Sequence, residues 1–128
     1  MPILLIPVET AAGETRVAVT PETVKKFTAQ GCRVILEKSA GRSSGYLDEA
    51  YAEAGAELVP CDDSTAWSQA DVVLCVQSPS ASALSRLRRG ALVVGLLAPY
   101  ANAELASALE QAGLSAMALE LLPRISRA

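Results

Sequence analysis

Short apolar runs alternate with amphipathic segments along the whole chain, and this alternation constrains the fold more than any other feature of the sequence. The run at 71–76 is uniformly apolar after Asp71, which is typical of a central strand buried on both faces. Strands that alternate with helices favour a parallel sheet, and right-handed crossovers place helices on both of its faces. We therefore predict an α/β domain with a doubly wound, mostly parallel, flavodoxin-like sheet. The expected strands are 3–7, 33–37, 56–59, 71–76, 91–97 and 114–119.

The first helix has recognisable ends in the sequence. Thr20 can cap a helix that begins at Pro21, because a hydroxyl accepts from a free backbone N–H and proline suits the first helical position. Val24 and Phe27 give this helix one apolar face, and Gly31 can end it. The pattern therefore predicts a helix that connects the first two strands.

Further helices are expected between the later strands. Asp48 would cap a short helix that buries Tyr51 and Ala54. A turn or brief helix is expected around Trp67, and Asn102 would cap a helix before the last strand. Each of these segments separates two apolar runs, as a βαβ arrangement requires.

Two segments suggest ligand binding but have simpler explanations. The stretch 39–45 (SAGRSSG) superficially resembles a phosphate-binding loop, yet it matches neither glycine-rich fingerprint, so we interpret 41–45 as a flexible surface loop. Arg86, Arg88 and Arg89 gather at the end of a helix expected at 82–89. Cations stabilise a helix at that end, so this cluster is interpreted as structural.

The composition excludes several classes of function. The chain has 11 basic and 14 acidic residues, without the concentrated positive charge of a nucleic-acid-binding protein. It has no histidine, which removes Ser-His and Cys-His nucleophile pairs and most zinc sites. No run approaches the roughly 18 apolar residues of a membrane-spanning helix. Cys32, Cys61 and Cys75 lie in or beside apolar runs and are expected to be reduced structural thiols of a cytosolic protein, not metal ligands.

Candidate binding residues follow the predicted strands. In an open α/β sheet, ligands bind beyond the carboxyl ends of the strands, where Arg16, Gln77, residues 99–100 and Glu120 are expected. No pair of carboxylates has a spacing typical of acid–base catalysis, and the serines within 78–85 have no histidine to activate them. The residues alone therefore predict a domain without catalytic side chains that contributes a binding surface to a larger protein or assembly.

Two segments resemble a known family. Residues 14–24 (ETRVAVTPETV) resemble the opening motif of the alanine dehydrogenase and nicotinamide nucleotide transhydrogenase family, and the similarity continues to 56. Residues 123–128 (PRISRA) resemble the alpha-subunit branch of the transhydrogenases. The resemblance covers essentially the whole chain and implies the same α/β fold.

The resemblance also identifies pocket residues. Alanine dehydrogenases hold their amino or keto acid with an arginine, a lysine and a histidine. Arg16 matches the arginine, Gln77 stands at the lysine position, and the chain has no histidine. These departures make alanine oxidation implausible and favour the transhydrogenase branch, with Arg16 and Gln77 as residues of the substrate pocket.

For the transhydrogenase branch, the resemblance implies a wall of an NAD(H) site. Four residues match the stretch that reaches the nicotinamide pocket: Arg124, Ile125, Ser126 and Arg127. Hydride would pass directly to NADP(H) on another component, so no side-chain base and no catalytic residue are expected. The implied partners are a membrane subunit that couples the exchange to proton movement and the NADP(H)-binding component. A homodimer of the complete alpha subunit is also implied.

The resemblance divides the chain into an α/β domain at 1–120 and, at 121–128, the start of a connection to a dinucleotide-binding domain. We therefore expect an N-terminal piece that is inactive alone and binds NAD(H) tightly only in the complete subunit. Its expected location is cytoplasmic, peripheral to the inner membrane through partner subunits. Two alternatives stay open: a stand-alone interaction or regulatory domain, and a fragment of an alanine dehydrogenase-like amino-acid dehydrogenase.

Overall fold

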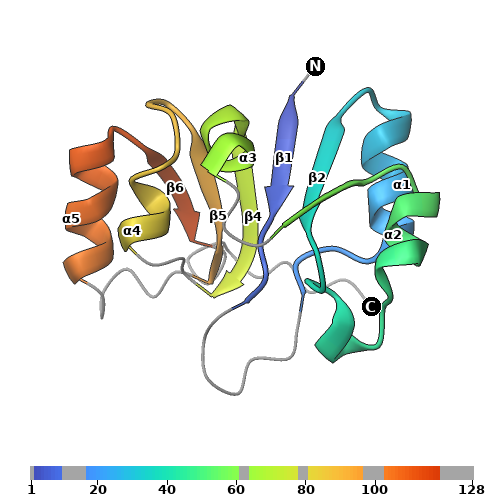
Figure 1. The fold of residues 1–128 in the computed structure, drawn as a ribbon. Helices are drawn as coiled ribbons and strands as arrows, with labels where there is room; N and C mark the ends of the chain where they lie inside the picture. The colour runs from blue at the N-terminus through green and yellow to red at the C-terminus, as the bar shows by residue number, and fades with distance from the viewer. Residues whose placement is uncertain (1, 10–16, 61–63, 78–80, 97–102, 119–128) are drawn as a thin grey trace, which may run out of the picture.

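The computed structural model describes residues 2–9, 17–60, 64–77, 81–96 and 103–118. Strands and helices alternate along this part of the chain, as the apolar runs predict (Figure 1). The strands are β1 (Ile3–Ile6), β2 (Arg33–Glu37), β3 (Glu57–Val59), β4 (Val72–Gln77), β5 (Leu92–Leu96) and β6 (Ser115–Ala118). The helices are α1 (Pro21–Ala29), α2 (Asp48–Glu53), α3 (Ser64–Gln69), α4 (Ala81–Leu84) and α5 (Ala103–Ala112), with a 3-10 turn η1 (Arg42–Ser44).

All six strands form one parallel sheet in the order β3-β2-β1-β4-β5-β6. The predicted doubly wound sheet with helices on both faces is confirmed. Its order is the one found in dinucleotide-binding folds, whereas flavodoxin itself has the order 2-1-3-4-5. The chain builds outward from β1 to β3 and then returns to β4 on the other side of β1. The topological switch point therefore lies between β1 and β4.

Side chains that alternate along the strands build two cores, one on each face of the sheet. Leu4 and Ile6 pack with Val24 of α1 and Tyr51 of α2. Leu5, between them, packs on the other face with the core that α3, α4 and α5 cover. Figure 1 shows α3 and α4 on that second face of the sheet. The central strand β1 is therefore buried on both sides, which explains its uninterrupted apolar sequence.

The cap of α1 forms as predicted. Thr20 has an extended backbone, and its hydroxyl accepts a 3.2 Å hydrogen bond from the N–H of Thr23. Gly31 follows the helix with a φ of 89°, a left-handed conformation that glycine adopts without steric cost. The termination signal in the sequence is therefore the one that the backbone uses.

Two of the predicted local structures are corrected. Asp48 does not cap α2: it is the first residue of the helix, and its carboxylate accepts a 2.9 Å hydrogen bond from the N–H of Ser39 instead. The loop expected at 41–45 contains the turn η1. Ser39 has a left-handed φ of 69°, so the Asp48 contact holds a bend that the sequence does not announce.

The helix expected at 82–89 ends early, at Leu84. The chain tightens there, because the N–H groups of Arg86 and Leu87 bond to carbonyls only three residues back. Arg86 and Arg88 therefore lie beyond the end of the helix, and their contacts come from elsewhere in the fold. Arg88 pairs with Asp71, and the Arg86 guanidinium lies 5.5 Å from the ring centre of Trp67.

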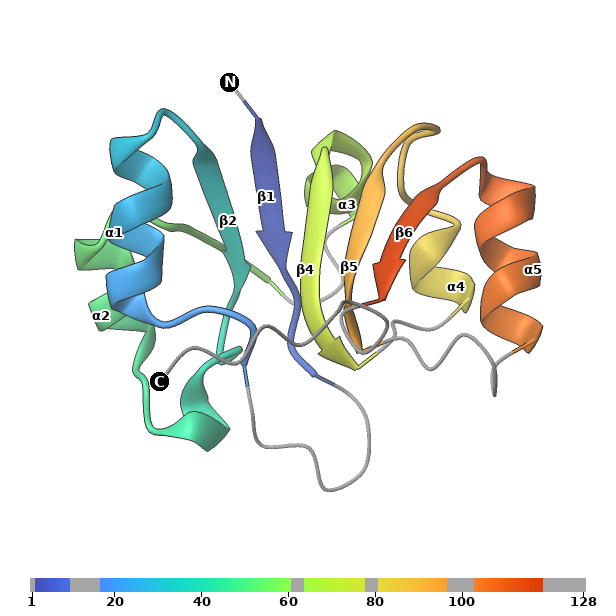
Figure 2. The ribbon, with the colours of Figure 1, turned by 180° about the vertical axis from the view of Figure 1, so that it is seen from behind.

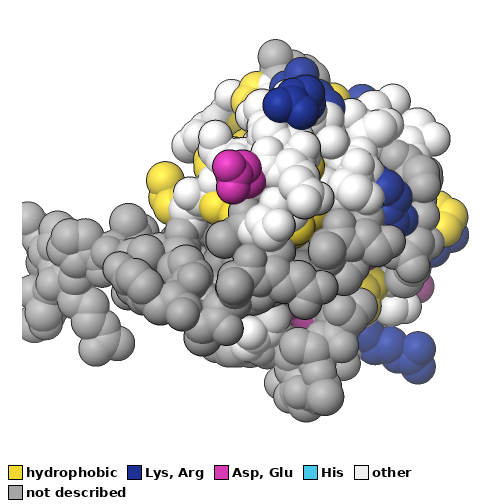
Figure 3. Space-filling view, turned by 90° about the vertical axis from the view of Figure 1, so that its left-hand side faces the viewer, with side chains coloured by type: hydrophobic (Ala, Val, Ile, Leu, Met, Phe, Trp, Pro, Cys, Tyr) yellow, Lys and Arg dark blue, Asp and Glu magenta, His cyan; other side chains and the backbone are white. Residues whose placement is uncertain are grey.

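The outer part of the sheet is less covered on the α1 side. No described helix lies in front of β4, β5 and β6 in the view of Figure 2. Figure 3 shows the end of the molecule that carries α5 and β6, where few charged side chains appear among the described residues. Met117 on β6 is 44% exposed.

None of the helices in the described ranges is long and apolar enough to cross a membrane.

Candidate functional site

Glu9 connects the carboxyl ends of β1 and β4, at the switch point of the sheet. Glu9 lies three residues beyond the end of β1. One of its carboxylate oxygens accepts a 2.9 Å hydrogen bond from the N–H of Val76, and the other accepts a 2.8 Å bond from the N–H of Gln77. A single side chain therefore occupies two neighbouring backbone donors where an open α/β sheet binds its ligands.

Glu37 holds the other flank of β1. It ends β2 and is only 4% exposed. Its carboxylate accepts a 2.8 Å hydrogen bond from the N–H of Val8 and a 3.3 Å bond from the indole N–H of Trp67. Since a buried carboxylate is costly unless it is hydrogen-bonded, these contacts explain how the charge is tolerated. The segment that follows β1 is thereby held at the end of β2.

The end of β4, where Glu9 binds, is also irregular. The pairing of β4 with β5 shifts between Leu74 and Gln77. Such a shift disturbs the regular ladder of backbone hydrogen bonds, and the Glu9 carboxylate supplies acceptors at that place. Gln77 itself is half-buried, so part of its side chain reaches the surface at this edge.

Cys75, two residues earlier on β4, is not a reactive thiol. It is 5% exposed, and its thiol donates a 3.3 Å hydrogen bond to the carbonyl oxygen of Val94. Burial, with the negative charge of Glu9 adding to it, raises the pKa of the Cys75 thiol to about 12. Cys75 and the half-buried Cys32 are both free, as expected of structural thiols, whereas Cys61 lies outside the described residues.

Among the predicted binding residues, the structure places Gln77. Arg16 lies outside the described residues, as do the residues at 99–100 and Glu120. The same holds for the predicted cofactor-binding residues, Arg124, Ile125, Ser126 and Arg127. The structure therefore tests neither their positions nor their proximity to Gln77.

Sequence reasoning missed Glu9 and Glu37 as functional candidates. Glu37 ends β2 and Glu9 lies three residues beyond β1, both at the ligand-binding edge, which is a usable signal. Apart from the Trp67 indole, the partners named above are backbone N–H groups 29 to 68 residues away in the sequence. A pattern based on residue types cannot detect such partners, because every residue except proline has a backbone N–H.

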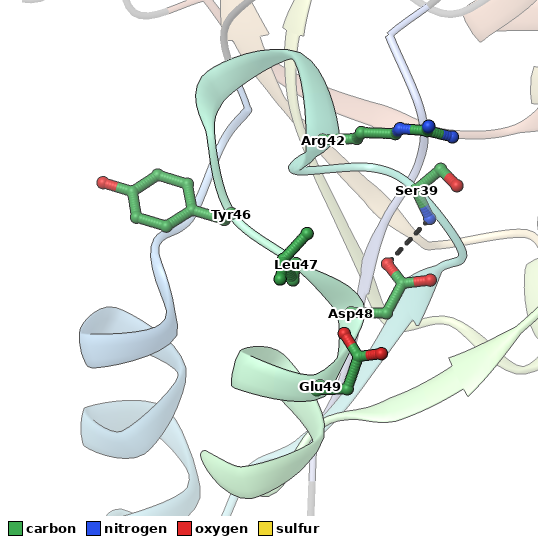
Figure 4. A pocket seen from close by; sticks show the side chains of 6 residues that line it. All are labelled: Ser39, Arg42, Tyr46, Leu47, Asp48 and Glu49. Atoms are coloured by element: carbon green, nitrogen blue, oxygen red, sulfur yellow. Dashed lines mark hydrogen bonds between the residues drawn. The ribbon is translucent and has the colours of Figure 1, made fainter.

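The stretch with superficial similarity to a phosphate loop forms a small open pocket of about 160 Å³ (Figure 4). Arg42 stands on one side, and Asp48 and Glu49 contribute carboxylates from the start of α2, while Tyr46 points away from Arg42. Ligand pockets usually measure roughly 300–1,000 Å³. The small volume and the carboxylates do not suit a dinucleotide, which agrees with the interpretation of a surface loop.

The described residues carry no catalytic constellation. No group of three or more His, Cys, Asp or Glu side chains in the described ranges could hold a metal ion. The carboxylates at the switch point are engaged with backbone donors, and the nearby thiol is protonated. Within the described ranges, this edge therefore offers backbone and side-chain groups that can position a ligand.

Comparison with known proteins identifies the family. Residues 5–128 match the family described as "Alanine dehydrogenase/PNT, N-terminal domain". The chain is 38% identical over 122 residues to the NAD(P) transhydrogenase subunit alpha of Cereibacter sphaeroides, covering 95% of this chain and 23% of that protein. It is 37% identical over 118 residues to the alanine dehydrogenase of Bacillus subtilis, covering 92% and 31%, respectively.

The fold agrees with a solved structure of the same family. The crystal structure of transhydrogenase from Sinorhizobium meliloti superimposes with a TM-score of 0.89 at 40% identity, covering 97% of this chain and 36% of that chain. The chain thus spans about a quarter to a third of the length of the relatives it matches. With the match from residue 5 to residue 128, the chain belongs to the family of alanine dehydrogenase and PNT N-terminal domains.

Proposed function

We propose that this domain forms one wall of the NAD(H) site in the alpha subunit of a proton-translocating NAD(P) transhydrogenase. The observation that carries the proposal is the similarity over nearly the whole chain to proteins named as that subunit. Hydride would pass between NAD(H) and NADP(H) held on a partner component. Direct transfer between two nicotinamide rings depends on their positions and needs no histidine or other side-chain base.

The described edge suits the uncharged part of a dinucleotide better than its phosphates. Phosphates are commonly bound by free backbone N–H groups at a strand–helix turn. At this switch point the N–H groups of Val76 and Gln77, at the end of β4, instead bond to the Glu9 carboxylate. The Gln77 side chain would supply a neutral amide toward the cofactor. The phosphates would then lie on a separate dinucleotide-binding domain.

The remaining roles rest on the family resemblance. In the proposed subunit, 1–120 is the α/β domain, and 121–128 begins the connection to the dinucleotide-binding domain. Arg124, Ile125, Ser126 and Arg127 would approach the nicotinamide, and Arg16 would join Gln77 in the pocket. The complete subunit would form a homodimer on the cytoplasmic side of the inner membrane, with a membrane subunit and an NADP(H)-binding component as partners.

A fluorescence titration with NADH tests the proposal. The first sample is the 128-residue chain alone. The second is a hybrid in which this chain replaces the matching N-terminal part of the Sinorhizobium protein, to which it is 40% identical. We expect binding to the hybrid and no tight binding to the chain alone. A correctly folded hybrid that binds no NADH would contradict the proposal, and tight binding by the short chain would show that the site is misplaced.

Alanine dehydrogenase activity is the second candidate, because the identity to the Bacillus subtilis enzyme is nearly as high. The resemblance places a lysine where this chain has Gln77, and a histidine that this chain lacks. We therefore expect no oxidation of NADH that depends on both pyruvate and ammonium by a hybrid with the Bacillus enzyme. Activity of that hybrid would favour this second function over the first.

A further inference from the structure

Two carboxylates join β1 to β4 at opposite ends of the sheet. Glu9 does so at the carboxyl end, where it bonds to the N–H groups of Val76 and Gln77. Asp71 does so at the amino end, where one oxygen accepts a 2.7 Å hydrogen bond from the N–H of Ile3 and the other pairs with Arg88. The two side chains do similar structural work, but only Glu9 lies at the ligand-binding edge.

We propose that Glu9 is a positioning residue with two effects. It fixes the end of β4, and with it Gln77. It also occupies the backbone N–H groups of Val76 and Gln77, so that phosphate groups do not bind to them. The functional part of this inference rests on the proposed NAD(H) site. The structural part concerns the described contacts alone and can be tested separately.

The geometry requires a carboxylate at position 9. Two adjacent N–H groups converge on one side chain, at 2.9 and 2.8 Å from its two oxygens. An ionised carboxylate has only acceptors, so it satisfies both donors. A glutamine would accept one of these hydrogen bonds but would turn its own NH₂ group toward the second donor. Replacing Glu9 by Gln therefore breaks one of these two hydrogen bonds with almost no change in the shape of the side chain.

Glu9 is itself held in place through the residue before it. The N–H of Val8, directly before Glu9, bonds to the buried carboxylate of Glu37. The path from β2 through Val8 and Glu9 to the end of β4 therefore consists of hydrogen bonds to two carboxylates. Since charge-assisted bonds are stronger than neutral ones, the position of Gln77 is well defined before any ligand binds. Such preorganisation favours binding, because less freedom is lost on association.

The negative charge of Glu9 also acts on ligands directly. A phosphate brought to the Val76 and Gln77 donors would have to displace the carboxylate and approach its charge. Like charges at such distances repel, most strongly where water is excluded. With Glu9 in place, this edge is therefore selective for uncharged ligand groups.

The structural part is tested by amide hydrogen exchange, followed by NMR on the 128-residue chain. In Glu9→Gln we expect the protection of Val76 and Gln77 to fall about tenfold or more, as for the loss of a hydrogen bond to a charged acceptor. Asp71→Asn is the matched control and should leave these two amides protected. Unchanged protection in Glu9→Gln, or equal loss in both variants, would overturn the inference. Glu9→Asp provides a second variant: it keeps the charge on a shorter side chain, and we expect it to lower the protection of the same two amides.

The functional part is tested by steady-state hydride transfer in the Sinorhizobium hybrid, with its partner components present. Glu9→Gln should raise KM for NADH at least fivefold with a smaller change in kcat, and inorganic pyrophosphate should become a stronger competitive inhibitor. Asp71→Asn should change neither value, even if it lowers stability equally. Equal effects of the two variants on KM and on inhibition would reduce Glu9 to a structural role. If the parent hybrid binds no NADH, the proposed function fails, while hydrogen exchange still decides the role of Glu9 at β4.

Discussion

The Tyr51 hydroxyl donates a 2.8 Å hydrogen bond to the carbonyl oxygen of Val19, 32 residues earlier in the chain. Tyr51 is fully buried, and its ring meets that of Tyr46 edge to face, with centroids 6.1 Å apart. This contact fastens α2 to the segment that leads into α1, directly before the Thr20 cap. It therefore helps to hold the first connection of the sheet in place.

Replacing Tyr51 by Phe should lower the free energy of unfolding by about 1–3 kcal/mol, because the buried carbonyl of Val19 loses its donor. Urea denaturation followed by circular dichroism measures the change. Tyr46→Phe is the control, because Tyr46 is only half-buried. Equal losses in the two variants would show that the hydrogen bond to Val19 contributes nothing specific.

The same tyrosine gives a pH dependence. Burial, with smaller electrostatic contributions from Tyr46 and Asp48, raises the pKa of Tyr51 to about 12. The folded state therefore holds this proton more tightly than the unfolded chain, where tyrosine titrates near about 10. Its contribution to stability is complete below pH 10 and is lost as the pH rises toward 12. Ultraviolet absorbance titration should show this late ionisation in the native chain but not in Tyr51→Phe.

Gly41 is required by the close approach of Tyr51. A Cβ atom at position 41 would lie 2.5 Å from two atoms of the tyrosine, including the hydroxyl oxygen. Gly41→Ala should therefore destabilise the fold by about 1–3 kcal/mol or more, as overpacking of a core does. Gly45→Ala is the control: it meets no atoms within 4 Å, and its φ of 88° should cost about 1 kcal/mol. Thermal denaturation of both variants measures the difference. If Gly45→Ala lowers the stability more than Gly41→Ala does, the close contact between position 41 and Tyr51 does not determine the need for glycine there.

Glu37→Gln tests the buried carboxylate beside β1. The amide can still accept from Val8, but its NH₂ group would face the indole N–H of Trp67. We expect a loss of about 1–3 kcal/mol in the free energy of unfolding. Because Trp67 is the only tryptophan of the chain, its fluorescence should shift as this contact opens. Glu57→Gln serves as control, since its ion pair with Arg33 is exposed and should contribute at most about 1 kcal/mol.

Cys75 should resist alkylation in the native state. Its thiol is buried, and its raised pKa of about 12 leaves almost no thiolate near neutral pH. Peptide mass spectrometry after treatment with iodoacetamide at pH 8 should show modification of the half-buried Cys32 well before Cys75. Denaturant should remove the difference. Rapid modification of Cys75 in the folded chain would contradict its placement in the core.

Local signals account for much of the correct prediction. Apolar runs located all six strands to within one residue at each end, and Thr20, Pro21 and Gly31 delimited α1. Local signals failed where a distant group competes for a residue. The Asp48 carboxylate bonds to Ser39 rather than capping α2, and α4 ends at Leu84 while the arginines that follow contact Asp71 and Trp67.

The candidate site was accessible to sequence reasoning only in part. The rule for open α/β sheets pointed to Gln77 at the end of β4, and the structure places it there. The rule did not predict the two hydrogen bonds that Glu9 accepts, because their donors are backbone N–H groups 67 and 68 residues away. Arg16 and residues 124–127 stay predictions, since they lie outside the described ranges.

The sequence by itself determined the fold class and, through its motifs, the family. Apolar runs that alternate with amphipathic helices are typical of a layered α/β arrangement, so this information is carried by residue type and spacing. Tertiary structure alone decided which carboxylate meets which backbone donor, and that β1 and β4 are joined at both ends by acidic side chains. Such contacts depend on the order of the strands and on the shift in register near the end of β4, which bring together groups that no local pattern relates.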